Sequence, residues 1–556
     1  MAADWRENAR QYWRPLVDAR FSGPSDPARL DMMDGELDVL LREMRVRALR
    51  LRNNSTRACS LPTEILTNIF SDLRDMWAPE RLDSFLSGWM VVTHVCSKWR
   101  EVAVGAPGLW AKHSEFLGTS LRYLPTILAR SKNHPLDLTA LWPEPPERND
   151  LVGWLSPPIC SRVKHLHLEG FADDDCEQLL PEISPYLSKL QTLYLETDCP
   201  YDRDVELPHE LCNIVAITDL TLKGFSLPWT SPIFSTSITT LTIHMSGNPI
   251  TQPTSACFED FCSSMPLLQS LRLDNVVPLD HSDDIIYMPR TLRYFNLRTY
   301  TSSNVLRSLS ILPQLRFPDP CMRSASIHDD EHRVDEHLLD TCEPLKRCLE
   351  RFHLFGNEAE DGPMELYYNY GQILAMQREQ TSRFLDSALL QTWTLPHDSV
   401  GSATGAHTLL RVDCTSFDDG ISSLRLNDLR AITIAPDSRT DLASLMPRFA
   451  SHASRVHRVG LWLSRSAAVL HALMKVERGK FAIFPCLKIL VLRGIQYVEY
   501  ANEATLFAQL TALVALVELR RSAGSPLMEI FVSRSTESWG VWDALRRDVT
   551  ISFYEC

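Results

Sequence analysis

The chain has 556 residues, of which 44% are hydrophobic and 23% are charged, an ordinary composition for a globular protein with an extended core. Its 56 basic and 70 acidic residues give a net charge of -14, which disfavours binding to nucleic acid or to an anionic membrane. The 14 cysteines have no zinc-ribbon spacing, so we expect reduced thiols in a cytoplasmic or nuclear protein, or one found in both compartments.

Residues 1–53 form a candidate amphipathic helical segment. Apolar residues recur in steps of three and four from Leu30 to Met44, which predicts one apolar stripe along a helix. The stripe is short for a coiled coil, so packing within the chain is favoured over pairing with a second copy. The start of the chain has no signal-peptide pattern, and residues 506–519 are too short to span a bilayer and are expected to form a buried helix.

Residues 54–118 contain two short apolar helical patterns. The stretch "LPTEILTNIF", residues 61–70, places aliphatic and aromatic side chains on one broad face of a helix. A second helix is predicted from Val92 to Gly105, followed by a Pro-Gly turn and Trp110. So small a unit cannot bury this much apolar surface by itself, so we expect a partner to cover the remainder.

These residues resemble the F-box family. Its pattern Leu-Pro-x-Glu-Ile-Leu-x-x-Ile-Phe matches residues 61–70, and its Val-Cys-x-x-Trp-Arg and Pro-x-Leu-Trp patterns match residues 95–100 and 107–110. The resemblance implies binding to the Skp-type adaptor of a Skp-cullin-F-box ubiquitin ligase and, through the adaptor, to a cullin. It also implies that the following residues make or support the adaptor contact: Leu61, Pro62, Ile65, Leu66, Ile69, Phe70, Val95, Trp99 and Trp110.

Residues 119–556 repeat a line of three aliphatic positions, in which two residues separate the first pair and one residue separates the second. A partial line contains Leu136 and Leu138, and full lines begin at Val163, Leu190, Ile217, Ile238, Leu268, Leu292, Leu349, Leu409, Leu429, Val456, Leu487 and Leu527. The early spacings of 27, 27, 21, 30 and 24 residues are typical of leucine-rich repeats. Helices are predicted between lines at 176–187, 304–312, 441–453 and 466–479.

The fold class predicted from these patterns is α/β, with a helical F-box followed by an irregular leucine-rich-repeat-like solenoid of parallel strands and outer helices. The asparagine usual after each line is nearly absent, so the turns should be closed by aromatic packing and backbone pairing. Longer gaps predict insertions near 318–345 and 360–405. The first is expected to be a solvated loop, and the second should contain a long helix over 364–393.

Most of the chain from Leu61 onward resembles fungal F-box proteins with such tails, which implies that the tail presents a protein substrate. Side chains between the aliphatic positions of each strand point away from the core and form one polar face. Mixed charge with tyrosine suits protein recognition, although a solvated face without a ligand is an alternative. The candidate substrate-binding residues are His165, His167, Glu169, Tyr194, Lys223, Arg272, Tyr294 and Arg298.

No catalytic motif stands out. The run of His, Asp and Glu at residues 328–337 matches no metalloprotease pattern, and we interpret it as a solvated charge run. We therefore expect no catalytic residue, metal or cofactor. Two alternatives remain: a repeat scaffold that does not direct degradation, and more remotely a metal-dependent hydrolase that uses residues 328–337.

Overall fold

The structure is a computed structural model that describes most of the chain in two compact units. The described residues are 4–23, 27–79, 88–114, 116–117, 119, 121–141, 148–198, 203–246, 248–280, 284–299, 301–318, 321–327, 348, 364–369, 372–376, 408–413, 424–435, 449, 452–462, 467–493 and 503–554. Unit 1 comprises Met1–Ala140 and Pro146–Leu155, and unit 2 comprises Leu141–Pro145 and Ser156–Cys556. The predicted boundary at residue 118 therefore lies inside unit 1.

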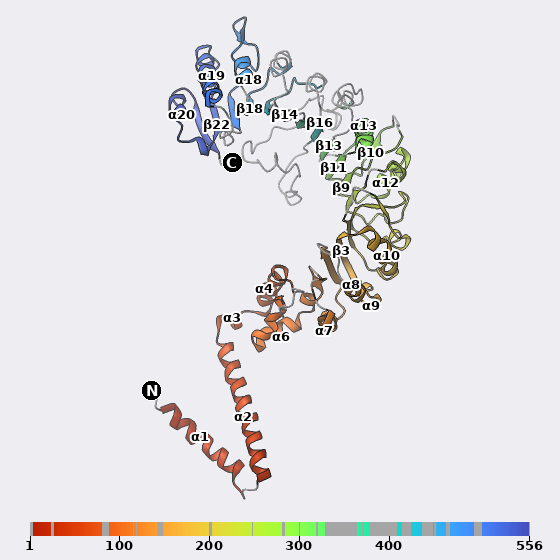
Figure 1. Cartoon of the computed structure of the whole chain (residues 1–556), viewed down its shortest axis with the longest axis vertical. Helices are drawn as coiled ribbons and strands as arrows, with labels where there is room; N and C mark the ends of the chain where they lie inside the picture. Colours follow the sequence, from red (N-terminus) through yellow and green to blue (C-terminus); the bar gives the residue numbers. More distant parts are fainter. Residues whose placement is uncertain are drawn as a thin grey trace. The chain divides into compact units, whose positions relative to one another are not determined.

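Unit 1 begins with two long helices, α1 (Asp4–Phe21) and α2 (Pro27–Asn54), drawn in red in Figure 1. The guanidinium of Arg20 on α1 forms two hydrogen bonds to the carboxylate of Glu36 on α2, at 2.9 and 2.6 Å. The predicted stripe lies on α2, where Met33, Leu37 and Met44 are half-buried but the Leu40 side chain is 40% exposed. The stripe is thus only partly covered within the chain.

A cluster of short helices follows in unit 1. Its elements are α3 (Arg57–Ser60), α4 (Thr63–Met76), η1 (Gly88–Val91), α5 (Val92–Val95), α6 (Ser97–Gly105), η2 (Pro107–Trp110), β1 (Lys112–His113), η3 (Leu121–Tyr123), α7 (Leu124–Ser131), β2 (Leu136–Leu141) and α8 (Arg148–Trp154). The single helix predicted from Val92 to Gly105 was wrong, because Cys96 is extended and divides it into α5 and α6. The Cys96 sulfur then caps α6 by accepting the N–H of Trp99 at 3.4 Å.

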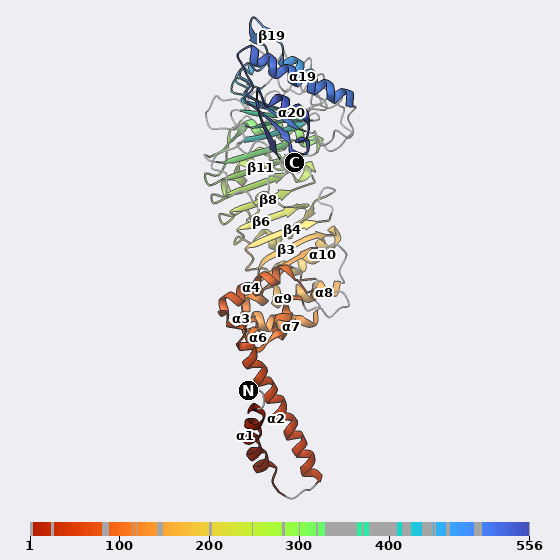
Figure 2. The ribbon, with the colours of Figure 1, turned by 90° about the vertical axis from the view of Figure 1, so that its left-hand side faces the viewer.

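Unit 2 is built on a sheet in which every strand except β15 runs parallel to its neighbours or is antiparallel only to β15. Its strands are β3 (Val163–Phe171), β4 (Thr192–Thr197), β6 (Asp219–Lys223), β8 (Thr240–His244), β9 (Ser270–Asp274), β11 (Tyr294–Thr299), β13 (Met322–Ile327), β14 (Glu365–Asn369), β15 (Gln372–Met376), β16 (Thr408–Asp413), β17 (Ala431–Ala435), β18 (Arg458–Trp462), β21 (Ile489–Arg493), β22 (Glu529–Ser533) and β23 (Thr550–Tyr554). Figure 2 shows the early strands stacked one above another. Leucines 166, 193, 220, 241 and 271 are aligned across five strands and are all buried.

Helices and short connections join these strands. They are α9 (Pro157–Cys160), α10 (Asp173–Ile183), η4 (Ser184–Tyr186), β5 (Val205–Glu206), α11 (His209–Cys212), β7 (Phe225–Ser226), η5 (Pro249–Thr251), α12 (Ser255–Ser264), β10 (Ile286–Tyr287), α13 (Ser302–Ile311), η6 (Leu312–Gln314), β12 (Leu315–Arg316), α18 (Ala467–Leu473), β19 (Val476–Glu477), β20 (Lys480–Phe481), α19 (Glu503–Ser522), η11 (Arg534–Thr536) and α20 (Gly540–Leu545). In Figure 1, α10 and α12 lie on one side of the sheet. The helices predicted at 176–187 and 304–312 are confirmed, whereas most of 441–453 lies outside the described residues.

The sheet contains an insertion that reverses direction. Strand β13 pairs with β16, and the order then runs through β15 and β14 to β17. Only β15 in this series is antiparallel to its neighbours. The prediction of a helix through residues 365–376 was therefore wrong, because these residues form the β14–β15 hairpin; residues 377–393 lie outside the described part of the chain.

Strand β13 also corrects the predicted solvated loop at 318–345. Arg323, Ala325 and Ile327 of this strand are buried and pair with the core positions of β11. Further along the sheet, the buried Arg458 and Glu365 form an ion pair at 2.8 Å that joins β18 to β14. The predicted line at Leu349 lies outside the described residues, and the other lines that begin at or after Val163 are occupied by strands.

The C-terminal part departs from the prediction at one more place. The helix expected over 466–479 ends at Leu473, and β19 and β20 form an antiparallel hairpin. Arg478 and Gly479 at its turn have φ values of 51° and 79°, which is typical of a two-residue hairpin turn. The helix expected at 506–519 is α19, which buries Leu513 and Leu516 while Phe507 is 75% exposed.

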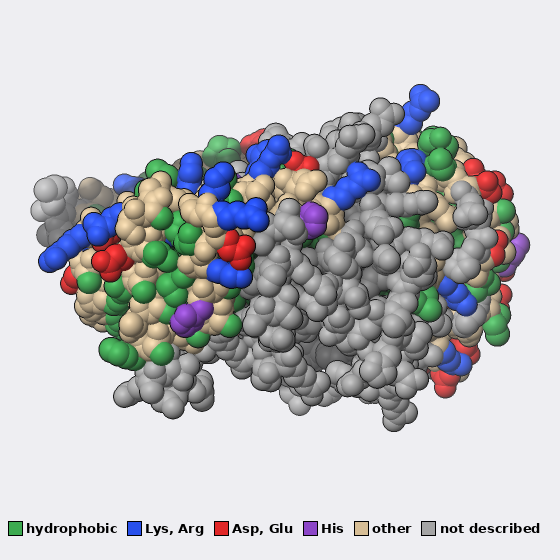
Figure 3. Space-filling model, turned by 90° about the horizontal axis from the view of Figure 1, so that it is seen from above, with side chains coloured by type: hydrophobic (Ala, Val, Ile, Leu, Met, Phe, Trp, Pro, Cys, Tyr) green, Lys and Arg blue, Asp and Glu red, His purple; other side chains and the backbone are tan. Residues whose placement is uncertain are grey.

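Figure 3 shows both signs of charge, together with hydrophobic side chains, on the described parts of the face that it draws. Within the described residues, no helix is both long enough and apolar enough to cross a membrane.

Candidate functional sites

Helix α4 divides its apolar residues between the core and the surface. Leu66 and Phe70 are fully buried, whereas Ile65 is 45% exposed and Ile69 is 43% exposed. This division follows from helical geometry, because residues four apart lie on the same side and adjacent residues differ by about 100°. Helix α4 therefore contributes both to the core and to an apolar surface.

We call the exposed apolar surface around α4 and α5 the docking face. It comprises Pro62, Ile65, Ile69 and Val95, with the half-buried Leu61 beside Pro62. Val95 is 55% exposed at the end of α5. Met76 at the end of α4, which was not predicted from the sequence, is 79% exposed and lies seven residues after Ile69, two helical turns along the same side.

Three other predicted adaptor residues, Leu66, Phe70 and Trp110, form the core beneath the docking face. Trp110 is fully buried, and its ring lies 4.8 Å from that of Trp89. Its indole N–H donates to the carbonyl of Ala103 at 2.7 Å, and the Arg130 guanidinium lies 4.3 Å from its ring centre. Leu66, Phe70 and Trp110 can therefore support a partner contact but cannot make one directly.

Trp99 lies between these two groups. It is half-buried, and its ring packs edge-on against Phe70 with centres 5.2 Å apart. Its indole nitrogen is buried and has no hydrogen-bond partner among the described residues. The position connects the core to the surface, and an unpaired N–H there is available to an acceptor only after a local rearrangement.

Acid should destabilise unit 1 through His113. This side chain is buried, which lowers its pKa from 6.5 to about 4, although one ring nitrogen lies 2.9 Å from the carbonyl of Trp110. The folded state thus binds a proton less readily than the unfolded state. The stabilisation by neutral His113 is complete above pH 6.5 and is lost as the pH falls towards 4, by about 3 kcal/mol in total.

Urea unfolding of the wild type and of His113→Gln at about pH 7 and about pH 5 tests this expectation. Hydrogen exchange in residues 97–113 reports the free energy of unfolding of unit 1. Between about pH 7 and about pH 5, this free energy should decrease by about 2 kcal/mol more in the wild type than in the variant. An equal decrease in both proteins would exclude His113 as the cause.

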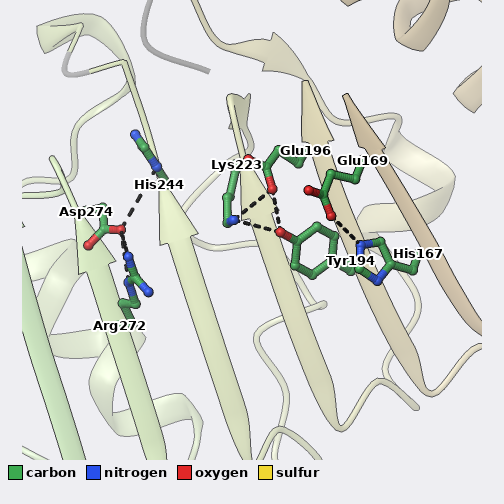
Figure 4. Close-up of polar contacts among 8 residues, drawn as sticks. All are labelled: His167, Glu169, Tyr194, Glu196, Lys223, His244, Arg272 and Asp274. Carbon is green, nitrogen blue, oxygen red and sulfur yellow. Dashed lines mark hydrogen bonds and ion pairs between the residues drawn. The ribbon is translucent and has the colours of Figure 1, made fainter. Parts of the chain in front are cut away.

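The second candidate site is the polar face of β3–β11, which we call the polar strand face. All eight predicted substrate-binding residues lie there and are half-buried. The ring of His167 stacks on Tyr194 at 3.8 Å, and His167 Nε2 lies 3.0 Å from Glu169 Oε2. Figure 4 draws His167, Glu169, Tyr194, Lys223 and Arg272 with Glu196, His244 and Asp274, and their polar contacts form separate groups on neighbouring strands.

Glu196 is the shared hydrogen-bond acceptor in one of these groups. Lys223 Nζ donates to Tyr194 Oη and to Glu196 Oε2, both at 2.7 Å, and the Tyr194 hydroxyl donates to the same carboxylate. Burial alone would raise the pKa of Glu196, but hydrogen bonds from Lys223 and Tyr194 lower it below its ordinary value. Burial, together with Glu196, raises the pKa of Tyr194, so the phenol stays protonated.

Three further strands, β8, β9 and β11, carry polar contacts as well. Arg272 donates to the buried Asp274 through Nε at 3.0 Å and lies 2.8 Å away through its terminal nitrogen. His244 lies 4.0 Å from the same carboxylate oxygen, and burial lowers its pKa. Tyr294 accepts a hydrogen bond from Asn296 at 3.2 Å. The structure thus places four of the predicted residues in one group of contacts with Glu196, and Arg272 in a second group with Asp274 and His244.

These contacts make the polar strand face an ordered surface. Charges of opposite sign are paired on strands of the sheet, which fixes the positions of their side chains. Within the described residues, no group of three or more His, Cys, Asp or Glu side chains could hold a metal ion. The run at residues 328–337 lies outside those residues.

Part of unit 1 is similar to a known protein family. Residues 58–115 match the F-box-like family model, which covers α3 to β1 and the docking face. This match supports an F-box protein, a class whose F-box domains generally bind Skp-type adaptors. No curated protein matches the chain.

Proposed function

We propose that this protein is the substrate-recognition subunit of a Skp-cullin-F-box ubiquitin ligase. The docking face binds the Skp-type adaptor, the adaptor connects to a cullin, and the polar strand face holds a protein substrate. The protein positions the substrate and leaves ubiquitin transfer to other subunits. Its place of action in this proposal is the cytoplasm, the nucleus or both.

The observation that carries the proposal is an F-box-like match on a helical unit that leaves an apolar surface exposed. Ile65, Ile69 and Val95 are 43 to 55% exposed, although they belong to the stretches that resemble the family pattern. Covering this surface with an apolar partner is favourable by about 25 cal/mol per Å². The surrounding core, which includes Trp110, keeps the surface in place without the partner.

We further propose that unit 2 is an irregular leucine-rich-repeat-like domain. Its parallel strands, aligned leucines and outer helices support this proposal, as do the early repeat spacings. A non-enzymatic role is part of this proposal, and its support is the F-box-like match at residues 58–115.

Purified full-length protein mixed with a purified Skp-type adaptor tests the central proposal. We expect a stable one-to-one complex on size-exclusion chromatography, and in the presence of the cullin we expect a ternary complex. Separate elution of the two proteins at concentrations of about 10 µM would overturn the proposal, because it would mean a binding free energy weaker than about -7 kcal/mol.

The substrate assignment is tested by removing one aromatic and one cationic side chain from the polar strand face. We expect Tyr194→Ala with Arg298→Ala to lengthen the half-life of substrate proteins to that seen when the whole chain is deleted, while adaptor binding persists. The matched control is Tyr186→Ala with Lys189→Ala, an exposed pair outside the strands. If both double variants degrade the substrate as the wild type does, the polar strand face is not the recognition surface.

A further inference from the structure

Two sulfur atoms approach each other next to the docking face. Cys59 Sγ on α3 lies 3.5 Å from Cys96 Sγ at the start of α6, although 37 residues separate them in the chain. Neither cysteine is in a disulfide, and both side chains are half-buried. The contact therefore joins the two halves of the F-box-like match through a pair of thiols.

Several other thiols are in a different environment. Burial raises the pKa of Cys160, Cys176, Cys321 and Cys348 to about 12 and disfavours their reactive anionic forms. Cys59 and Cys96 retain contact with solvent. The N–H of Trp99 also donates to the Cys96 sulfur, which holds that sulfur in place beside Cys59.

We propose that Cys59 and Cys96 form a reversible disulfide that controls adaptor binding, an inference that rests on the function proposed above. Hydrogen peroxide oxidises one thiol to a sulfenic acid, breaking the O–O bond and releasing water. The second thiol loses its proton and attacks the sulfenic sulfur, so that the S–S bond forms, the S–O bond breaks and a second water leaves. A dithiol reductant reverses the reaction.

The disulfide would alter the docking face directly. An S–S bond is about 2.05 Å long, so the two sulfurs must approach by about 1.5 Å. Helix α3 has no buried residue and can move, and Cys59 lies only two residues before Leu61. Cys96 follows Val95 directly and caps the helix that carries Trp99. The bond therefore changes the relative positions of residues on both sides of the docking face and should weaken adaptor binding.

The test uses the full-length protein, reduced or treated with hydrogen peroxide. After alkylation and proteolysis, mass spectrometry should detect a peptide cross-linked between Cys59 and Cys96 in the oxidised sample. The dissociation constant of the oxidised full-length protein for the purified adaptor should be at least about tenfold higher than that of the reduced protein. Dithiothreitol should return it to the reduced value. Absence of the cross-linked peptide, or a cross-link with unchanged affinity, overturns the proposal.

Serine variants separate this effect from general oxidation. Cys59→Ser should bind the adaptor like the reduced wild type and should not respond to peroxide. The matched control Cys257→Ser removes a thiol on α12 in unit 2 and should keep both the cross-link and the loss of affinity. If the reduced wild type does not bind the adaptor, the proposed function and the proposed control of adaptor binding are both wrong. Mass spectrometry of the cross-linked peptide still shows separately whether the disulfide forms.

Discussion

Replacement of Ile65 and Ile69 by aspartate should weaken adaptor binding about 100-fold without unfolding unit 1. Roughly half of each side chain remains exposed, so its burial by a partner should contribute about 1 kcal/mol or slightly more. The aspartates add the free-energy cost of removing two carboxylates from water. Together these effects reach about 2.7 kcal/mol, which corresponds to a 100-fold increase in the dissociation constant. Isothermal titration with the purified adaptor measures it.

The control must remove an exposed isoleucine from elsewhere. Ile250 in unit 2 is 89% exposed, so Ile250→Asp makes the same chemical change at a surface outside the docking face. We expect wild-type affinity from this variant and the same thermal unfolding curve from all three proteins. Wild-type affinity in the Ile65→Asp, Ile69→Asp variant would show that the adaptor does not bind this side of α4.

Replacement of Trp110 by alanine should destabilise unit 1 by about 3 to 5 kcal/mol, the usual range for removing a large buried aromatic side chain. The change removes the contact with Trp89, the hydrogen bond to Ala103 and the contact with the Arg130 guanidinium. Adaptor binding should be lost as well, but as a consequence of unfolding. Because the chain has 13 tryptophans, hydrogen exchange within residues 97–113 during urea unfolding is a more specific measurement than fluorescence.

Trp5→Ala is the matched control for the loss of a tryptophan. Trp5 is 61% exposed on α1, so its removal should change the free energy of unfolding by less than about 0.5 kcal/mol. If Trp110→Ala proved as stable as Trp5→Ala, the described core of unit 1 would not be the one that maintains the docking face.

Only part of the docking face could be predicted from the sequence. The apolar pattern at residues 61–70 predicted a helix and one broad apolar face, and α4 confirms the helix. The pattern could not separate Ile65 from Leu66, because both are aliphatic and the boundary between core and surface depends on where α6 and η2 pack. Cys96 was placed within a helix because local apolar spacing does not show that a sulfur atom caps the next helix.

In unit 2, prediction succeeded where aliphatic residues recur and failed where other residues take their places. Strand β13 was missed because Arg323 and Ala325 occupy core positions that are leucine or phenylalanine in β11. The β14–β15 hairpin was assigned to a helix because a short apolar run is compatible with either period. Pairing between strands decides such cases, and it depends on residues distant in the sequence.

The polar strand face was predicted from alternation alone. Strand periodicity placed Tyr194, Lys223 and Arg272 on the same side of the sheet, and the structure confirms this arrangement. The role of Glu196 as the shared acceptor for Tyr194 and Lys223 was not predictable, because it requires the register between β4 and β6 and the rotamers of three side chains.

The number of alternating strands inserted between β13 and β17 must be odd. Three strands in alternating directions leave the two outermost ones, β14 and β16, pointing the same way as β17 and β13. Two or four strands would have presented an opposed strand to one of those neighbours and disrupted a parallel ladder. An insertion at this place can therefore contain an odd number of alternating strands, or parallel strands with their connecting segments. Either kind of insertion leaves the strands before β13, and with them the polar strand face, unchanged.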